Sequence, residues 1–168
     1  SSLSFTPGSR YFYSSWGYFT LGYIMEKVTG KSYAQLMKDD IFDKLQMTNS
    51  GSYQHLQIVP NRATGYDYSF GGFTSADFRD QSNTMGTGDL YSTVEDLFKF
   101  HLAISNHTLL SKELTDEMLT PGMRPARYGY GWFNQNFKYT TEDSVAANFH
   151  LGTTEGFISF MLRIPSTN

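Results

Sequence analysis

The sequence predicts an α+β protein in which helices come first and strands last. Two observations carry this prediction. Before residue 122, apolar residues recur every three or four positions in several segments, which is the period of an α-helix. After it, the segments 128–133, 149–153 and 157–164 are rich in aromatic and β-branched residues, which favours strands.

The first predicted helix runs from about Tyr18 to Val28, and its apolar spacing predicts a buried face. Gly30 stands where a left-handed C-cap is expected. The residues Thr29-Gly30-Lys31-Ser32 also resemble the end of a phosphate-binding loop. That loop needs a preceding strand and a glycine at position 25, which is Met25 here, so we predict a helix stop instead.

Capping boxes predict the starts of two further helices, at Ser32 and at Ser92, because each serine is followed three positions later by Gln or Glu. The first of these helices should extend to Ile41 and the second to about Ile104. A short helix is expected to start at Ser111 and to end before the Pro-Gly pair at 121–122.

The segment 51–88 is rich in Tyr, Gly, Asn and Ser, and it is expected to be mostly irregular. A loop of this length in a compact domain is usually functional. We therefore expect it to form a wall over a cleft.

The last predicted strand, 157–164, is followed by Pro165-Ser166-Thr167-Asn168 and by no further element. A strand without its neighbour exposes backbone groups that can pair with another chain. The sequence therefore predicts open sheet edges through which the chain could self-associate.

Composition excludes several classes of function. Lys and Arg number 13 against 16 Asp and Glu, and this net charge of −3 argues against a nucleic-acid partner. The absence of Cys excludes disulfides, thiolate metal sites and a Cys nucleophile. The four His lack the spacing of a helical zinc site. No apolar run approaches the roughly 20 residues of a transmembrane helix.

Two short segments carry residues suited to catalysis. His150 lies in a predicted strand before Gly152, and a glycine in a strand lets a backbone or a ligand approach closely. Backbone N–H groups there could form an oxyanion hole, or the segment could be an ordinary bulged hairpin. Tyr13 precedes the first helix. A tyrosine becomes a base where cationic neighbours stabilise its phenolate, and otherwise it packs.

Taken in order, these segments resemble the serine β-lactamase and penicillin-binding-protein-like superfamily, most closely its class C β-lactamase, esterase and D-peptidase branch. The landmarks of that branch are similar to the segments 5–8, 13–18, 21–33, 41–48, 62–66, 88–97 and 150–152. The resemblance implies a single, partial β-lactamase-like domain over 1–168. Its helical and loop part would be 1–122 and its strands 123–168.

The resemblance also implies acyl transfer, in which a Ser of a Ser-x-x-Lys motif attacks a carbonyl. Tyr13 would be the general acid and base, Ser15 would stand at the position of the family's Asn, and His150 would be the electrostatic partner. Gly152 and Thr153 would form the substrate and oxyanion side, with Thr153 supplying the N–H. This chemistry needs no metal or organic cofactor, and it acts on a small molecule or a peptide, with relatives commonly periplasmic or extracellular.

Three departures from the family pattern stand out. No Ser lies three positions before any Lys in the chain, Ser15 replaces Asn, and Leu151 replaces a hydroxyl residue. We therefore expect a serine hydrolase fragment that lacks the N-terminal nucleophile segment and the C-terminal end, and that is inactive alone. The alternatives are a non-catalytic binding module for a peptide or small acyl ligand, and a structural α+β domain.

Overall fold

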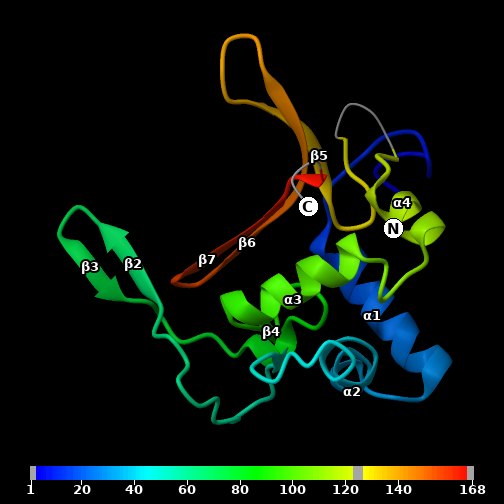
Figure 1. Ribbon diagram of the computed structural model, residues 1–168. Helices are drawn as coiled ribbons and strands as arrows, with labels where there is room; N and C mark the ends of the chain where they lie inside the picture. The colour runs from blue at the N-terminus through cyan, green and yellow to red at the C-terminus, as the bar shows by residue number, and fades with distance from the viewer. Residues whose placement is uncertain (1–2, 123–126, 166–168) are drawn as a thin grey trace. The chain divides into compact units, whose positions relative to one another are not determined.

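The computed structural model describes residues 3–122 and 127–165, and it confirms the α+β class (Figure 1). Its strands form two small two-stranded ladders and one three-stranded sheet. The helices and strands are, in chain order, α1 Ser15–Thr29, α2 Tyr33–Met37, η1 Lys38–Phe42, β1 Gly51–Ser52, β2 Tyr66–Ser69, β3 Gly72–Ser75, η2 Gln81–Asn83, β4 Leu90–Tyr91, α3 Val94–Ser105, α4 Lys112–Leu119, β5 Phe133–Lys138, β6 Ser144–Thr154 and β7 Phe157–Arg163.

The chain divides into two compact units. The first comprises Ser1–Tyr13, His101–Leu151 and Phe160–Asn168, and the second comprises Ser14–Phe100 and Gly152–Ser159. The boundaries fall inside α3, β6 and β7. The predicted change from helices to strands at residue 123 lies outside the described residues, and the single partial domain stays a prediction.

Helix α1 begins and ends where local hydrogen bonds can satisfy its ends. The Ser14 hydroxyl accepts the Gly17 N–H at 3.2 Å, and Gly30 takes the left-handed conformation with φ of 73° while its N–H bonds to the Glu26 carbonyl. A left-handed C-cap favours glycine because a Cβ is costly there. The predicted helix stop at Gly30 is therefore confirmed.

The predicted buried face of α1 is wrong. Gly22 is the buried residue of this helix, with Met85 and Tyr33 packed 3.5–3.6 Å from where its Cβ would be. Among the described residues, little of α1 beyond Gly22 is packed against other segments. Its large apolar side chains stay exposed, at Trp16, Tyr18, Leu21, Tyr23, Ile24, Met25 and Val28.

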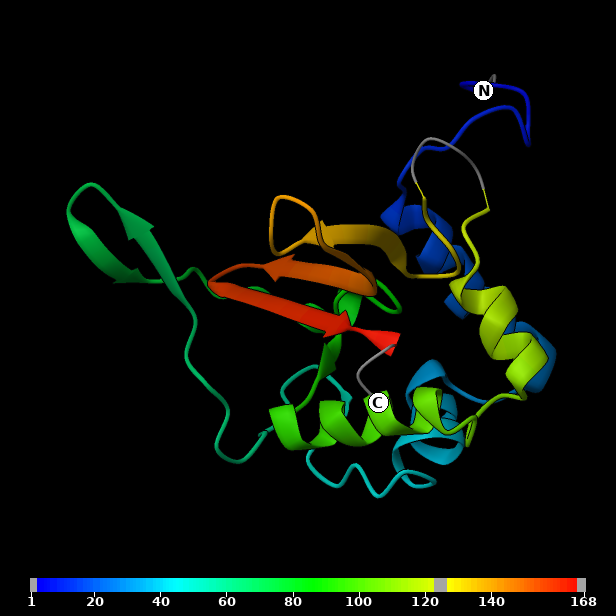
Figure 2. The same cartoon turned by 45° about the horizontal axis from the view of Figure 1, so that its top comes forward.

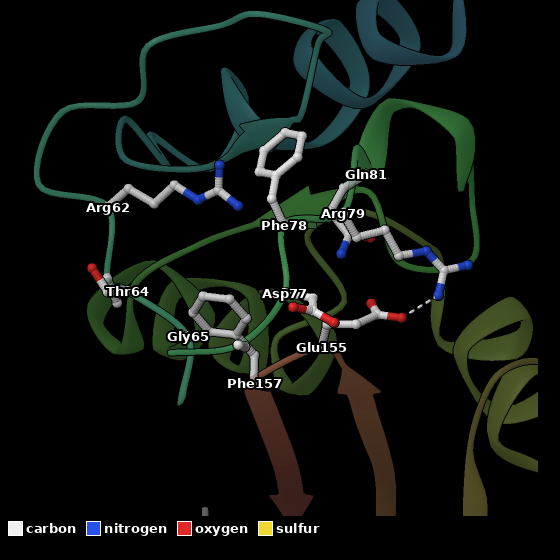
Figure 3. A pocket seen from close by; sticks show the side chains of 11 residues that line it. Arg62, Thr64, Gly65, Asp77, Phe78, Arg79, Gln81, Glu155 and Phe157 are labelled. Atoms are coloured by element: carbon white, nitrogen blue, oxygen red, sulfur yellow. Dashed lines mark hydrogen bonds and ion pairs between the residues drawn. The ribbon is translucent and has the colours of Figure 1, made fainter. Parts of the chain in front are cut away.

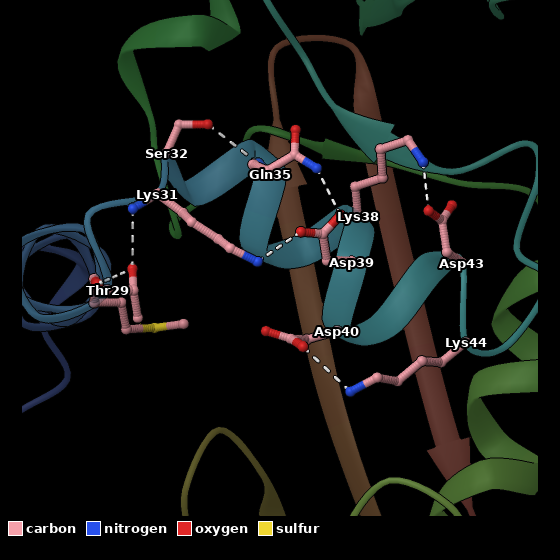
Figure 4. Close-up of polar contacts among 10 residues, drawn as sticks. Thr29, Lys31, Ser32, Gln35, Lys38, Asp39, Asp40, Asp43 and Lys44 are labelled. Atoms are coloured by element: carbon pink, nitrogen blue, oxygen red, sulfur yellow. Dashed lines mark hydrogen bonds and ion pairs between the residues drawn. The ribbon is translucent and has the colours of Figure 1, made fainter.

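Helix α2 continues directly into the π-helix η1 (Figure 4). The Ser32 hydroxyl caps it by accepting the Gln35 N–H at 3.2 Å, as predicted. The Gln35 side-chain amide donates to Asp39 at 2.6 Å. Asp39 also pairs with Lys31 at 2.8 Å. The other faces of α2 and η1 bury Tyr33, Leu36 and Phe42 in the core of the second unit.

Most of the segment 51–88 is irregular, as predicted, but it contains β1, the β2–β3 hairpin and the short helix η2. Strand β1 pairs with β4, and β2 and β3 form an antiparallel hairpin in which Tyr68 faces Phe73. Nearly every residue of this hairpin is exposed on both faces. Tyr66-Asp67-Tyr68-Ser69 alternates aromatic and polar residues and is followed by Gly71-Gly72, a hairpin signal in the sequence that the prediction passed over.

The N-cap of α3 lies one residue later than predicted, at Thr93 instead of Ser92. The Thr93 hydroxyl, rather than that of Ser92, accepts a helix N–H, that of Asp96 at 3.2 Å. Helix α4 follows the prediction, since the Ser111 hydroxyl caps it by accepting the Leu114 N–H.

The side chain of Asp96 is fully buried between α3 and the segment after η1. Its carboxylate accepts the Asn49 N–H at 2.8 Å, the Ser50 hydroxyl at 2.9 Å and the Lys99 ammonium at 2.7 Å. Burial raises the pKa of Asp96, but these three hydrogen bonds outweigh it and hold the pKa below its ordinary value. The carboxylate thus ties α3 to the segment at Asn49 and Ser50.

The three-stranded sheet has the order β5-β6-β7, and β5 runs antiparallel to β6 (Figure 2). The segments 149–153 and 157–164 fall in β6 and β7 as predicted. The strand expected at 128–133 is wrong, because β5 starts at Phe133 and Tyr128 forms a single bridge with it. The intervening residues turn back on themselves, with the Gly129 N–H bonded to the Trp132 carbonyl.

Candidate active site

His150, on β6, has hydrogen-bond partners at both ring nitrogens. Its Nδ1 lies 2.6 Å from the Leu151 carbonyl oxygen, and its Nε2 lies 2.9 Å from the Tyr128 hydroxyl. A carbonyl can only accept, so Nδ1 carries a proton. In the neutral ring, Nε2 is then the acceptor and the Tyr128 hydroxyl donates to it.

Tyr13 lies beside this histidine. The ring centroids of Tyr13 and His150 are 6.2 Å apart, and those of Tyr13 and Tyr128 are also 6.2 Å apart. Tyr13 is about half exposed. The structure therefore brings together two residues that the sequence predicted as partners, although the hydrogen bonds of His150 go to Tyr128 and Leu151.

Aromatic rings hold this group in place. Tyr128 packs edge-on against Phe133 at 4.6 Å, and Phe133 lies 5.6 Å from the His150 ring. Phe133 also stacks on Phe149, its cross-strand partner. The sequence analysis did not single out Tyr128. The glycines at 129 and 131 that form the turn after it are the local signal that could have found it.

The other predicted site residues belong to the second unit. Ser15 is the first residue of α1 and is exposed. Gly152 and Thr153 lie near the end of β6, and Thr153 is exposed. A side chain at Gly152 would collide with the Ser159 hydroxyl, which explains a glycine at this point of the strand.

Two side chains from the segment 51–88 hold the residues that follow Thr153. The Gln81 amide donates to the Thr154 hydroxyl at 2.7 Å, and Arg79 forms an ion pair with Glu155 (Figure 3). The hydrogen bond from Arg79, with further bonds from the Glu155 backbone and Thr154, lowers the pKa of Glu155 to about 2. The end of β6 is thereby fastened to a loop.

A pocket of about 270 Å³ lies at the same place, within the second unit (Figure 3). The segment 51–88 supplies most of its lining, as expected of a segment that walls a cleft. Its lining carries both signs of charge together with aromatic rings, from Arg62, Asp77, Phe78, Arg79, Glu155 and Phe157.

No helix in residues 3–122 and 127–165 is long and apolar enough to cross a membrane. Over the same residues, no three His, Asp or Glu side chains are grouped so that they could hold a metal ion.

Known proteins match the chain over its full length. Residues 1–168 match the family model described as Beta-lactamase. The chain belongs to the beta-lactamase family.

Among members with a curated name, the teichoic acid D-alanine hydrolase of Staphylococcus aureus is 31% identical over 129 residues, 74% of this chain and 32% of the relative. Among solved structures, the octameric penicillin-binding protein homologue from Pyrococcus abyssi is 27% identical with a TM-score of 0.73, over 95% of this chain and 37% of that one. The D-stereospecific amidohydrolase from Streptomyces sp. is 23% identical with a TM-score of 0.83, over 96% and 48%.

The beta-lactamase family is thus shown by a match along the full chain, and its fold by the structural likeness. The chain spans about a third of the length of the curated relatives that it matches, between 31% and 38%. It spans up to about half of the solved chains.

Proposed function

We propose that this chain contributes the tyrosine and histidine side of an acyl-transfer site in a serine hydrolase that cleaves an amide or an ester. The observation that carries the proposal is the pair Tyr13 and His150. The sequence singled out both residues, and the structure holds them side by side in one aromatic cluster of a beta-lactamase-family chain.

In the proposed reaction, a serine hydroxyl attacks the substrate carbonyl and its proton passes to Tyr13. The bond to the leaving group breaks, and the leaving group takes that proton. Water then attacks the acyl-enzyme carbonyl and loses a proton to the same base; the bond between the carbonyl carbon and the serine oxygen breaks, the serine oxygen takes that proton, and the acid is released. A positively charged His150 ring near Tyr13 would stabilise the phenolate form. Ser15 and Gly152 would contact the substrate, and the Thr153 N–H would face the oxyanion.

We further propose that the nucleophile belongs to a Ser-x-x-Lys motif outside these 168 residues. The support is that no serine stands three positions before any of the seven lysines, Lys27, Lys31, Lys38, Lys44, Lys99, Lys112 and Lys138. Without the nucleophile, binding and oxyanion contacts alone leave a small residual rate.

For the substrate, we propose an ester or amide whose acyl group is a D-amino acid. The name of the Staphylococcus aureus relative, a teichoic acid D-alanine hydrolase, supports this class. Ser15 and Leu151 support it too, since they replace the family's Asn and hydroxyl residue and so fit an esterase or peptidase better than an antibiotic-destroying enzyme.

The test is intact-mass spectrometry before and after a fluorophosphonate and a penicillin. The chain alone should keep its mass of 19.1 kDa. The polypeptide translated from the gene's full reading frame should gain one adduct per molecule. In that polypeptide, Tyr13→Phe should lower the turnover of D-alanyl esters by about 10²–10⁴-fold, the usual contribution of a general base.

The matched control is Tyr139→Phe, which removes the hydroxyl of an exposed tyrosine beyond β5 and should leave turnover unchanged. A stoichiometric adduct on the chain alone would contradict the proposal, because the nucleophile would then lie among these residues.

A second candidate is a non-catalytic binding module for a peptide or small acyl ligand. The absence of Ser-x-x-Lys from the chain favours it, and the pocket beside Glu155 offers it a place. A full reading frame that also lacks the motif, together with calorimetric binding of D-alanyl esters without turnover, would support this candidate over the hydrolase.

A further inference from the structure

The contact between Tyr128 and His150 suits both protonation states of the imidazole. In the neutral ring, Nδ1–H donates to the Leu151 carbonyl and Nε2 accepts from the Tyr128 hydroxyl. In the cationic ring both nitrogens donate, and the same hydroxyl can accept after rotating about its C–O bond. A hydroxyl can do both, whereas a carbonyl can only accept and an ammonium can only donate.

The position of the Tyr128 hydroxyl is set by the backbone around it. Tyr128 bridges to Phe133, the first residue of β5, and its ring packs edge-on against the Phe133 ring at 4.6 Å. Phe133 is in turn the cross-strand partner of Phe149, the residue before His150 on β6. The register of β5 against β6 therefore places the Tyr128 hydroxyl at the imidazole.

We propose that Tyr128 is a positioning residue that fixes the orientation of the His150 ring through the hydrogen bond at Nε2, while the Leu151 carbonyl holds the ring in the Nδ1–H tautomer. The ring then gains a proton at Nε2, or loses it, without turning away from Tyr13. The tautomer follows from the two hydrogen bonds alone. Its consequence for Tyr13 rests on the proposed function, in which the charged ring 6.2 Å away favours the phenolate.

The direct test is nitrogen NMR of the chain labelled with ¹⁵N at its histidine rings. The pH is raised until the histidine ring signals no longer change, so that the rings are neutral. We expect His150 to show a protonated Nδ1 and an unprotonated, hydrogen-bonded Nε2. His107 serves as the reference within the same spectrum, because its ring is exposed and has no side-chain hydrogen bond among the described residues. A protonated Nε2 on neutral His150 would overturn the proposal.

The variant Tyr128→Phe removes the hydroxyl and keeps the ring that packs on Phe133. The Nε2 resonance of His150 should move to the position of a ring nitrogen without a hydrogen bond. The matched control is Tyr130→Phe, whose lost hydroxyl bonds to Glu117 at 3.2 Å and which should leave the His150 signals in place. An unchanged Nε2 resonance in Tyr128→Phe would refute the assignment. If that variant fails to fold, the protonation of the two ring nitrogens of His150 in the unmodified chain still tests the proposal.

Kinetics of the full-reading-frame polypeptide separate this inference from the proposed function. Tyr128→Phe should lower kcat by about five- to tenfold, the effect of one hydrogen bond, with KM nearly unchanged. If His150→Ala leaves turnover intact, the proposed role of His150 fails while the tautomer assignment stands. If His150→Ala lowers turnover and Tyr128→Phe does not, the positioning role fails.

Discussion

The backbones of Gly65 and Gly156 pack directly against each other, with no side chain between them. A Cβ on Gly156 would come within 2.7 Å of the Gly65 Cα, and one on Gly65 within 3.2 Å of the Gly156 Cα. The Gly156 carbonyl accepts the Tyr66 N–H at 3.2 Å, and the Gly65 carbonyl accepts the Ala76 N–H at 3.0 Å. This contact joins the turn between β6 and β7 to the base of the β2–β3 hairpin, beside the pocket.

The first prediction is that Gly156→Ala destabilises the protein by about 2–4 kcal/mol. Gly156 has a φ of 72°, which costs an alanine about 1–2 kcal/mol, and the added methyl overpacks against Gly65 and Ala76. Urea unfolding measures the change. Gly71→Ala is the control, since open space surrounds a Cβ there and φ is not positive, and it should change stability little. Equal effects of the two variants would contradict the close approach.

The second prediction concerns pH. The pKa of Glu155 is lowered in the folded protein from 4.5 to about 2, chiefly by the hydrogen bond from Arg79. A lowered carboxyl pKa stabilises the fold above the unfolded value, and this stabilisation is lost as the pH falls from about 4.5 through 2. A carbon-NMR titration of the Glu155 carboxyl should therefore have its midpoint near pH 2, and the β6–β7 turn should loosen in that window.

Arg79→Met should raise the Glu155 midpoint toward its ordinary value. Arg62→Met is the matched control, because Arg62 lines the same pocket and has no hydrogen bond to Glu155 among the described residues. A midpoint near 4.5 in the unmodified chain would show that the ion pair does not form in solution.

The third prediction is that Asp96→Ala costs about 3 kcal/mol of unfolding free energy. Removing the buried carboxylate leaves the Asn49 N–H without its acceptor and takes from the Lys99 ammonium its ion-pair partner, while Lys99 keeps its hydrogen bond to the Gln46 carbonyl. Chemical denaturation measures the loss. Glu95→Ala, at the exposed neighbouring position of the same helix, should stay within about 0.5 kcal/mol of the unmodified protein. A small loss in both variants would mean that Asp96 does not organise this part of the fold.

The fourth prediction is that the chain self-associates through β7. This strand is last in the order β5-β6-β7, and Ile158, Phe160 and Leu162 on it are exposed. An open edge with apolar side chains pairs readily with a second copy. Sedimentation at rising concentration should show dimers, and Ile158→Lys should reduce them. Thr140→Lys, in the exposed turn after β5, should not. A monomer at all concentrations would show that the β7 edge does not pair with a second copy of the chain.

Capping serines and glycines were the most informative residues of the sequence. Ser32, Ser111 and Gly30 mark helix ends in the structure as they do in the sequence, because a cap is a hydrogen bond or a backbone conformation within four residues. The hairpin β2–β3 and the start of β5 were missed. Strand pairing depends on partners elsewhere in the chain, which local composition does not specify, and the alternation of aromatic and polar residues at 66–69 before Gly71-Gly72 was not used.

Part of the candidate site could also be predicted. Tyr13 and His150 came from their motifs, and the structure places their rings together. The roles of Ser15, Gly152 and Thr153 stay predictions. The turn glycines after Tyr128 could have drawn attention to it, but its contact with His150 joins residues 22 positions apart through the register of two strands, which the sequence does not give.

By itself, the sequence determined the α+β class, the helix caps at Ser32, Ser111 and Gly30, and the family, because these depend on short-range hydrogen bonds and on motifs read in order. The expected order of helices first and strands last is wrong, because strands β1 to β4 precede α3 and α4. Only the tertiary structure decided that α1 keeps its apolar side chains exposed, that two glycine backbones meet at the β6–β7 turn, and that Tyr128 reaches His150. Burial, close packing and side-chain hydrogen bonds between distant segments arise from how the chain folds back on itself, and no local pattern encodes that.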